Sequence, residues 1–599
     1  MRKIRKMVFL FLIAAMVGLL TGCENKENSG EREEKDTQKT ENVRPNQDIT
    51  YEGSSKEEGQ AYYTGKVIQA SIENNEYGGP QFVAKLFTEG LSRAPEGSEY
   101  AAYTGRIEKD GCTVETLTAL AEQIFSSQEF QEEKLTERER TFTVYRAILS
   151  REPDKGELEQ HLHTEAEELA RELCGTEEFA ALLPDINRGP YYWKGNNQEI
   201  YTGTNVITSS EIQKLFKENT HVVLPRGTQV LVTSTISIPE GGTLETEGNP
   251  THYARMARLI RAGSSDYHLV IMQSDASMKN IYVEGGLSGY ETNEVLSGSN
   301  VLVRGSNGKV LECRISDSVS HQNLWVIDAA EHGYVAHNLV TGYASDHTKT
   351  WQDGITCLGT DFVIEYNDVV DVTDASIAMF RYVNAQSDQP HSRAQNSIVR
   401  YNKMMCLGNS AYVAYDHETG NYHTDSSEGI RHPANMTGLV AYENQIWTSM
   451  RAHYHMMVTM STVPWLTEAN CDKTVGGSVY NNYTPQGCYA LTACAIAVDK
   501  VTEAAVRGNS FHLYLGEWCR PTQGMGARIY SVNESNTTKS TLQGGYVNRQ
   551  MAPKGAAFIC TLSEGLKLEE AEHILLKEAV VHEDKQTIPV SRFQSETLE

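Results

Sequence analysis

The sequence predicts a mainly β protein, in which a right-handed parallel β-helix, or solenoid, follows a small N-terminal all-α double domain. Three observations predict this fold. One short pattern, an aliphatic residue, two others and then Asn, returns along residues 310–509. Alternating apolar strand segments follow each copy, without amphipathic helices. The spacing between copies varies, so the extra residues belong to loops rather than to the repeated core.

The repeated Asn marks one coil of the solenoid per copy. Full copies of the pattern end at Asn338, Asn367, Asn402, Asn482 and Asn509, a weaker copy ends at Asn444, and Cys313 takes the Asn place in the first copy. The successive steps from Cys313 are 25, 29, 35, 42, 38 and 27 residues. Strands stacked about 4.8 Å apart must keep register. Loops of different lengths on one flank would therefore build a groove.

The chain begins with a segment that resembles a bacterial lipoprotein signal peptide. Four basic residues precede an apolar run over 7–20, which ends in Leu-Thr-Gly-Cys at Cys23. The run is short for a membrane-spanning helix, and no other stretch is long enough to span a bilayer. The resemblance implies that 1–22 is removed and that a lipid on Cys23 holds the chain outside the cytoplasm, on the bacterial cell membrane. A plain signal peptide and a membrane anchor are the alternatives.

Residues 23–60 contain almost no large apolar side chains, so they predict a disordered tether. The 599-residue chain has a formal net charge of −26, and loss of four basic residues with the signal takes it near −30. Such a surface repels nucleic acid at long range. It also disfavours a polyanionic substrate unless Arg or Lys lines the groove. We expect no nucleic-acid partner and a monomer that contacts the membrane through the lipid on Cys23.

Residues 61–188 have the apolar spacing of helices and contain two similar units. Residues 91–96 match 149–154, and residues 127–130 match 176–179. These segments resemble a bacterial extracellular domain of unknown function that has an L-G-R-x-P-D turn and a closing S-x-E-F helix. Ser92 and Ser150 stand where that family usually has Gly. The resemblance implies no chemistry, and we expect a structural spacer or docking module.

The β-helix is expected over 195–520. Residues 222–227 and 236–241 are strand-then-Gly-turn units that resemble the first coils of pectate-lyase-like proteins. A helix over 209–219 is expected to cap the open end, which would otherwise expose unpaired backbone groups. Residues 521–599 lose the coil pattern and predict a C-terminal cap or tail, with a helix-like stretch over 566–582. Three cysteines in separate coils are expected to be buried thiols rather than disulfides, whereas four later ones are close enough to pair: Cys313, Cys357 and Cys406, then Cys471, Cys488, Cys494 and Cys519.

One pair of carboxylates stands out in the middle coils. Aligning residues 351–357, 373–379 and 409–415 stacks Ile355, Ile377 and Val413 as an inward aliphatic ladder. Asp353 then begins its strand, and Asp374 lies one place earlier in the next coil. Backbones roughly 5 Å apart would hold the carboxylates about 5 to 9 Å apart, which suits glycoside hydrolysis by two carboxylates. The competing interpretation is that each Asp caps backbone N–H groups at a coil corner.

The strand of Gln352, Asp353, Gly354 and Ile355 resembles the Asn-Thr-Asp-Gly-Ile strand of polygalacturonase-type β-helix hydrolases. Residues 373–378 resemble their Gly-Asp-Asp-Cys-Ile-Ala strand. The resemblance implies that Asp353 and Asp374 are catalytic carboxylates. The sequence departs from that family at Ala375, which replaces an Asp, and it lacks a good copy of Gly-His-Gly and any Arg-Ile-Lys. A galacturonan substrate is therefore not expected.

Seven further residues are expected to bind a polysaccharide in the groove: Trp351, Arg381, His391, Arg393, Tyr415, Asp416 and His417. Carboxylates near the longest insertion are oxygen ligands of the kind Ca²⁺ takes, although their spacing fits no familiar loop motif. Ca²⁺ is therefore the one cofactor that the sequence leaves open, and no metal ligand is assigned.

The leading function is glycoside hydrolysis of a polysaccharide. The second is a polysaccharide lyase or epimerase on the same fold, with Arg381, Arg393 or Lys349 as the base. The third is a surface protein that binds glycans without catalysis. The sequence contains no P-loop, no GxGxxG after a strand, no HExxH and no GxSxG elbow, so the functions that those motifs carry are not indicated.

Overall fold

The computed structural model describes residues 78–188, 191 and 205–515, with gaps at 263–266, 287–297, 328, 344–351, 383–393, 410, 421–435, 450–451, 462–473, 500, 503–504 and 508, and short strands between 528 and 588. The predicted signal peptide, tether and Cys23 lie outside these residues. In the part of the chain that is described, no helix combines the length and the apolar composition needed to cross a bilayer.

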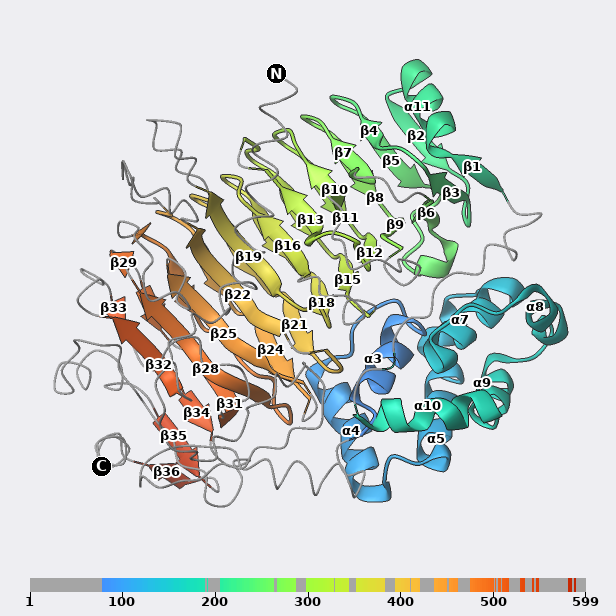
Figure 1. Ribbon diagram of the computed structural model, residues 1–599, viewed down its shortest axis with the longest axis horizontal. Coiled ribbons are helices and arrows are strands. Elements are labelled where there is room, and N and C mark those ends of the chain that lie inside the picture. Colours follow the sequence, from blue (N-terminus) through green and yellow to red (C-terminus); the bar gives the residue numbers. More distant parts are fainter. Residues whose placement is uncertain are drawn as a thin grey trace, which may run out of the picture.

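Three long, largely parallel sheets form the body of the molecule, and each coil visits them in the order C, B, A (Figure 1). Sheet C contains β4 (Ile236–Ile238), β7 (Val270–Met272), β10 (Ser299–Val303), β13 (Gln322–Val326), β16 (Asp353–Cys357), β19 (Ala375–Tyr382), β22 (Ala411–Gly420), β25 (Tyr454–Ser461), β28 (Ala490–Asp499), β31 (Ser510–Leu515), β32 (Arg528–Asn533), β34 (Tyr546–Asn548), β35 (Val580–Glu583) and β36 (Gln586–Ile588).

Sheet B contains β2 (His221–Leu224), β5 (Thr243–Thr246), β8 (Ser277–Lys279), β11 (Lys309–Leu311), β14 (Tyr334–Ala336), β17 (Val363–Glu365), β20 (Ile398–Arg400), β23 (Val440–Tyr442), β27 (Ser478–Tyr480), β30 (Ala505–Arg507) and β33 (Thr541–Leu542). Sheet A contains β1 (Val206–Thr208), β3 (Gln229–Val232), β6 (Ala257–Arg261), β9 (Ile281–Glu284), β12 (Arg314–Ser316), β15 (Leu339–Thr341), β18 (Asp368–Val370), β21 (Lys403–Cys406) and β24 (Gln445–Thr448). A separate pair joins β26 (Thr474–Val475) to β29 (Val501–Thr502). This architecture confirms the predicted right-handed parallel β-helix behind an α-helical region.

The repeated Asn residues form a hydrogen-bonded ladder at the turn from sheet B to sheet A. Each side-chain amide donates to the carbonyl oxygen of the next Asn, at 2.8 to 3.0 Å, from Asn338 through Asn367, Asn402, Asn444 and Asn482 to Asn509. At the end of the ladder the Cys313 amide donates to Asn338 Oδ1 (2.9 Å). From Cys313 to Asn482, the residue before each ladder position has a left-handed backbone. The ladder satisfies backbone groups that this sharp turn would leave unpaired, and it confirms one coil per copy.

The interior of the sheet C stack corrects one part of the sequence alignment. Ile355 pairs with Ile377 as predicted, but Ile377 pairs with Tyr415, and Val413 pairs with Ala375. The alignment over 409–415 is therefore wrong by two residues. A shift of two keeps the same side chains inward, because the side-chain period of a strand is two. The hydrophobic pattern alone does not distinguish the two registers.

Helix α11 (Ser209–Glu218) lies at the N-terminal end of the coils, as predicted, with Ile212 fully buried in the solenoid core (Figure 1). At the other end, parallel pairing continues beyond the expected boundary at 520. β32 pairs with β28, β33 with β30, and β34 with β31. Val580–Glu583 forms strand β35, beside β34, where the sequence suggested a helix-like stretch.

The helical unit contains two repeats, and an Arg residue makes the same set of contacts in each. The first repeat has α3 (Pro80–Thr88), α4 (Gly97–Asp110), α5 (Val114–Phe125) and α6 (Gln128–Glu132); the second has α7 (Glu137–Leu149), α8 (Lys155–His161), α9 (Ala166–Cys174) and α10 (Glu177–Arg188). Arg93 binds Glu99, Glu129 and the carbonyl of Ala94. In the second repeat Arg151 makes the same three contacts, with Glu157, Glu178 and the carbonyl of Glu152.

Ser92 and Ser150 both have a left-handed backbone, with φ of 58° and 52°. Glycine adopts this conformation without strain, which explains why a Gly suits this place in the related turn. Each Ser makes a contact that Gly lacks. The Ser92 hydroxyl accepts a hydrogen bond from the amide of Tyr253 in the coils (3.0 Å), and the Ser150 hydroxyl lies 2.7 Å from Lys85 Nζ.

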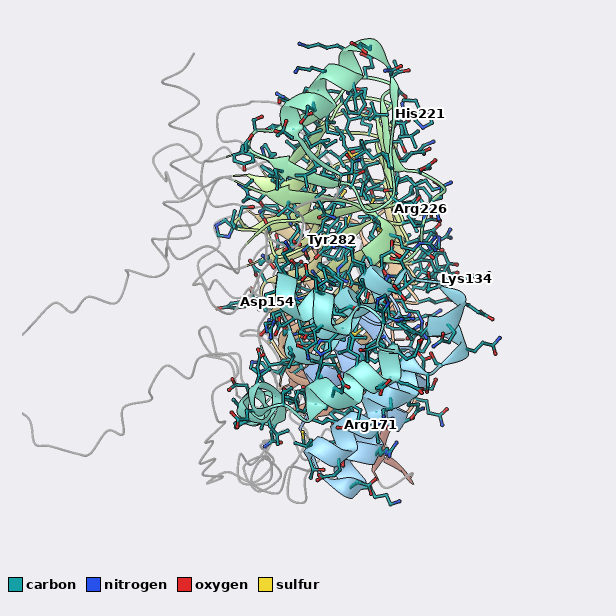
Figure 2. All side chains as sticks on the ribbon, turned by 90° about the vertical axis from the view of Figure 1, so that its right-hand side faces the viewer. Lys134, Asp154, Arg171, His221, Arg226 and Tyr282 are labelled. Atoms are coloured by element: carbon teal, nitrogen blue, oxygen red, sulfur yellow. The ribbon has the colours of Figure 1, made fainter. Side chains whose placement is uncertain are left out.

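The helical unit packs against the outer face of sheet A (Figures 1 and 2). Its core is continuous with side chains from that face, including Val370, Met405 and Trp447. Charged residues such as Lys134 and Arg171 lie on its outer surface (Figure 2). Because the two parts share one hydrophobic core, the helical unit is docked on the coils rather than suspended from them.

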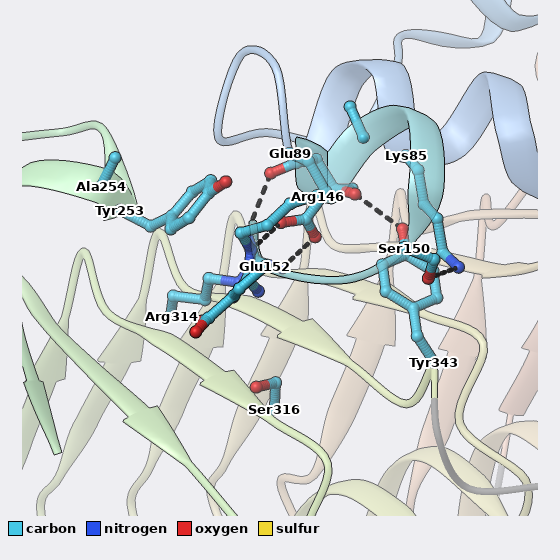
Figure 3. A network of polar contacts seen from close by, with 12 residues as sticks. Lys85, Glu89, Arg146, Ser150, Glu152, Tyr253, Ala254, Arg314, Ser316 and Tyr343 are labelled. Atoms are coloured by element: carbon cyan, nitrogen blue, oxygen red, sulfur yellow. Dashed lines mark hydrogen bonds and ion pairs between the residues drawn. The ribbon is translucent and has the colours of Figure 1, made fainter. Parts of the chain in front are cut away.

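Buried charges also join the two parts (Figure 3). Glu89, the C-cap residue that follows α3, forms ion pairs with Arg146 of α7 (2.8 Å) and with Arg314 of β12. Arg258 of β6 pairs with Glu152 of the helical unit (2.6 Å). Arg258 also binds Glu284 of β9, and Tyr253 and Tyr282 lie against the guanidinium groups. Three Arg and three Glu thus balance one another at the interface.

The cysteines follow the expected pattern where they are described. Cys313, Cys357 and Cys406 are buried thiols in separate coils, as predicted. Cys488 is also a buried thiol. Cys471, Cys519 and the side chain of Cys494, which the sequence would allow to pair with it, lie outside the described residues.

Candidate functional site

Asp353 opens β16, and hydrogen bonds fix its backbone and both carboxylate oxygens. Its amide donates to the carbonyl of His321 (2.6 Å), and its own carbonyl accepts from Asn323 Nδ2 (3.0 Å). Oδ1 accepts from the amide of Ala375 in the next coil (3.1 Å), and Oδ2 accepts from the Thr356 hydroxyl (2.7 Å). The carboxylate therefore holds one orientation while its side chain remains partly exposed. The bond to Ala375 is also the corner-capping role that the sequence left open.

Gly354 allows the coils to approach closely beside Asp353. A Cβ at this position would lie 2.4 Å from the carbonyl oxygen of Ser376 and 2.6 Å from Cγ1 of Val369. Both contacts are shorter than van der Waals distance, so a larger residue would push the coils apart at the site. The Asp-Gly pair of this strand therefore has a local steric reason.

Asp374 lies immediately before β19, opposite Gln352. Its amide donates to the carbonyl of Gln352 (3.0 Å), and its carbonyl accepts from the amides of Tyr412 (3.1 Å) and Val413 (3.2 Å). Asp374 thus stands one place before the residue that faces Asp353, as the sequence alignment predicts. Within the described residues no hydrogen-bond donor contacts its carboxyl group, which is partly exposed. Asp374 therefore caps no backbone group there.

Asp416 adds a third carboxylate from the next coil. It lies in β22, pairs with Ala378 of β19, and is 4% exposed. The hydroxyl of Thr459 in β25 donates to its Oδ1. The charge of Asp416 acts on both Asp353 and Asp374. Three aspartates from three consecutive coils of sheet C therefore form one electrostatic cluster.

The protein raises the pKa of both partly exposed carboxyl groups. Desolvation raises the pKa of Asp353 from 3.8 to about 6, with a smaller rise from Asp416, against the lowering effect of Thr356 and Ala375. Desolvation, followed by the charges of Asp353 and Asp416, raises the pKa of Asp374 well above 3.8. No cation among the described residues contributes to either shift. Because hydrogen bonds from Thr356 and Ala375 oppose the rise at Asp353 and none from a described residue opposes it at Asp374, Asp374 is the carboxyl group of the pair that favours its protonated form.

Tyr415 and His417 lie inside the solenoid, which corrects their expected place in the groove. Tyr415 is 1% exposed and packs in the core between Ile377 and Val458. His417 is also 1% exposed, pairs with Met379, and has no described hydrogen-bond partner at either ring nitrogen. Burial lowers the pKa of His417 to about 3, so its ring is neutral. Because side chains alternate along β22, only Asp416 between them points outward.

The structure does not describe the side chains of the other residues that were expected in the groove. Trp351, His391, Arg393 and Lys349 lie outside the described residues, and Arg381 is described only by its backbone in β19. The same holds for most of the acidic residues considered for Ca²⁺. Among the described residues, no three His, Cys, Asp or Glu side chains come close enough together to hold a metal ion.

Sequence reasoning missed the side chains that hold the carboxylates. Thr356 and Thr459 are single hydroxyl residues in apolar strands, and the partner of each is set by coil register. Trp325 of β13 was also missed. It pairs directly with Thr356, on the outward face of sheet C, and is half-buried. The alternation of residues 322–326 gave the one available signal, an aromatic at an outward position.

No protein-family model matches the sequence, and no curated protein matches it. Three solved structures are similar at low identity. The Dettilon tailspike protein has 13% identity and a TM-score of 0.25 over 56% of this chain and 68% of its own. Pectate lyase Pel9A has 11% identity and a TM-score of 0.24 over 52% of this chain and 70% of its own. Endo-xylogalacturonan hydrolase from Aspergillus tubingensis has 12% identity and a TM-score of 0.28 over 60% of this chain and 100% of its own. Alignments at such TM-scores carry no argument about this chain, so its fold rests on its own strand register.

Proposed function

We propose that the protein is a glycoside hydrolase that acts on a polysaccharide, with Asp374 as the general acid and Asp353 as the second carboxylate. One observation carries the proposal: two partly exposed carboxyl groups from adjacent coils interact electrostatically but have different environments. Hydrolysis of a glycosidic bond needs such a pair, one protonated and one ionised. The charge of the third carboxylate, Asp416, raises the pKa of both.

Asp374 suits proton donation to the leaving oxygen of the glycosidic bond. Its raised pKa keeps the proton in place, and no described hydrogen bond competes for the carboxyl group. Asp353 suits the opposite role, because the donors at both oxygens stabilise its charged form. It would either take a proton from the attacking water molecule or attack the anomeric carbon itself. In the second case Asp374, ionised after it has protonated the leaving oxygen, would take a proton from the water that releases the sugar.

The first test is a screen of the full-length chain against plant, microbial and host polysaccharides. New reducing ends and ultraviolet absorbance are measured together, beside Asp353→Asn and Asp374→Asn. Reducing ends without absorbance, lost in both variants, support the proposal. Absorbance from an unsaturated product, lost with a chelator, indicates a lyase instead. Binding without cleavage, unchanged in both variants, indicates a glycan-binding surface protein.

We further propose that the enzyme works outside the cytoplasm on a lipid anchor. The lipoprotein-like segment ending at Cys23 supports this proposal. Metabolic labelling with a radioactive fatty acid is expected to mark the wild-type chain and not Cys23→Ala. Equal labelling of both chains would contradict the assignment of the lipid to Cys23.

A further inference from the structure

A straight row of side chains runs along the outward face of sheet C towards the carboxylates. Strand pairing aligns Ile271, Leu302, Trp325, Thr356, Ala378 and Asp416 across six consecutive coils. Adjacent members of the row lie about 4.8 Å apart along the solenoid. The N-terminal end of the row is apolar. At Thr356, whose hydroxyl donates to Asp353, the row reaches the aspartate cluster.

Trp325 is the large aromatic residue of this row. Its neighbours in β13, Leu324 and Val326, are fully buried in the solenoid core, so the indole points away from the core. The side chain is half-buried rather than covered, and in the described part of the chain its Nε1 has no hydrogen-bond partner. A half-buried indole whose Nε1 has no partner among the described residues offers a ligand both an apolar face and a hydrogen-bond donor.

His268 lies beside Trp325 and adds a polar group. The two ring centroids are 6.2 Å apart, with the planes tilted by 47°. Nδ1 of His268 lies 3.0 Å from the Ser299 hydroxyl, which orients the imidazole, and Nε2 has no partner among the described residues. Desolvation, followed by the charges of Arg261 and Arg304, lowers the pKa of His268 to about 4. The ring is therefore neutral above that pH and adds no charge to the place.

We propose that Trp325 and His268 form a sugar-binding subsite one coil away from the carboxylates, on the N-terminal side. The indole would stack on the apolar face of a pyranose ring, and Nε2 of His268 would bond to one of its hydroxyl groups. Sugars present this combination of an apolar face and a polar edge, and pockets that bind small ligands combine aromatic surface with a few polar groups. The proposal rests on the proposed function, because it names where that substrate lies.

The subsite is tested on the full-length chain by affinity electrophoresis in gels containing xylan, mixed-linkage glucan, polygalacturonate or mannan, together with reducing-end assays on the same polysaccharides. Trp325→Ala is expected to weaken retardation and to raise KM by about tenfold, the usual cost of losing an aromatic anchor. The kcat should change little. Trp325→Phe should recover part of the affinity. Tyr366→Ala, which removes an exposed aromatic from the turn between sheets B and A, is the matched control and should change neither.

The outcomes separate the subsite from the hydrolase. Cleavage that needs Asp374, with KM raised in Trp325→Ala alone, supports both proposals. Cleavage with unchanged KM and retardation in Trp325→Ala overturns the subsite and leaves the hydrolase. Retardation that is lost in Trp325→Ala, without cleavage of any polysaccharide, supports the subsite and overturns the hydrolase. A wild-type chain that neither binds nor cleaves the panel overturns both.

Discussion

Two clusters of charged residues lie on different faces of the solenoid, and they differ in whether opposite charges pair within them. At the interface between the helical unit and sheet A, three Arg and three Glu are buried and paired with one another. On sheet C, three aspartates interact, and no cation among the described residues contributes to the pKa of Asp353 or Asp374. The first cluster is balanced and closed to solvent. The second is unbalanced, and two of its members are partly exposed.

The difference separates a structural use of charge from a chemical one. Paired charges lower the pKa of Glu89 to about 2, through Arg314 and Arg146, against desolvation. The pKa values of Asp353 and Asp374 move the other way, which favours a proton on Asp374 that it can donate. Perturbed pKa values of this second kind are more typical of functional sites than of ion-pair networks.

Arg314→Met should destabilise the protein by about 3–5 kcal/mol, because it removes one of the two guanidinium groups that pair with the buried Glu89 carboxylate and leaves three buried Glu facing two Arg. Arg314 is 1% exposed and also donates to the carbonyl of Thr88 (3.0 Å). Urea unfolding measures the effect. Arg171→Met is the control, because Arg171 pairs with Glu122 on the surface and should change stability by less than about 1 kcal/mol. Equal losses of stability in the two variants would contradict the structural role of the buried network.

Asn402→Ala should cost about 1–3 kcal/mol, since it leaves the backbone amide of Asn367 without its acceptor in the ladder and removes one of the two donors to Asn444 Oδ1. The loss should be in stability and not in chemistry, because the ladder lies at the turn between sheets B and A. Thermal unfolding and hydrolysis rate are measured on the same preparation. A variant that unfolds as the wild type does would show that the ladder records the coil repeat without stabilising it.

The aspartate cluster should make the protein less stable as pH rises. The folded-state pKa of Asp353 is raised from 3.8 to about 6, so the folded chain binds more protons than the unfolded chain between these values, and stability falls across that window. Glu89 acts with the opposite sign, and its contribution is lost as pH falls from 4.5 towards 2. The difference in Tm between wild type and Asp353→Asn/Asp374→Asn, measured from pH 4 to 7.5, should therefore favour the variant increasingly. A constant difference would contradict the raised pKa values.

Asp416→Asn should have the smallest effect, a shift in pH dependence. Removing its charge lowers the pKa of Asp353 and Asp374, so both limbs of the pH–rate profile should move to lower pH. Asn preserves the size of the side chain and can still bond to Thr459. A profile that stays in place, with activity lost at every pH, would instead make Asp416 a group that contacts the substrate.

The fold followed from the sequence because the ladder residues occur once per coil, and the left-handed turn before each of them favours the same hydrogen-bonded Asn. The aspartate pair was predictable for a similar reason, since Asp353 and Asp374 each stand at a strand start. Tyr415 and His417 were misplaced although the inward position of Val413 already puts both on the inward face of β22, because side chains alternate with a period of two. The two-residue error in register changed the residues with which they pair, and not the face on which they lie.

The environment of the site was beyond sequence reasoning. Thr356 and Thr459 reach Asp353 and Asp416 only through coil register, and Arg314 and Glu89 meet across 225 residues of chain. Ion pairs of this kind have no periodicity along the chain. The helical unit was expected to be a spacer or docking module, and that role stays a prediction; the structure shows that the unit shares a hydrophobic core with sheet A.

The most direct test is the hydrolysis rate of Asp374→Asn on a polysaccharide that the wild type cleaves, measured together with its Tm at pH 7.5. The account predicts that the rate falls about 100- to 10,000-fold, the usual contribution of a general acid, while the Tm stays the same or rises, since the variant removes a desolvated carboxyl group. A rate within tenfold of wild type, or a loss of activity that accompanies a fall in Tm, would contradict the assignment of Asp374 as the proton donor.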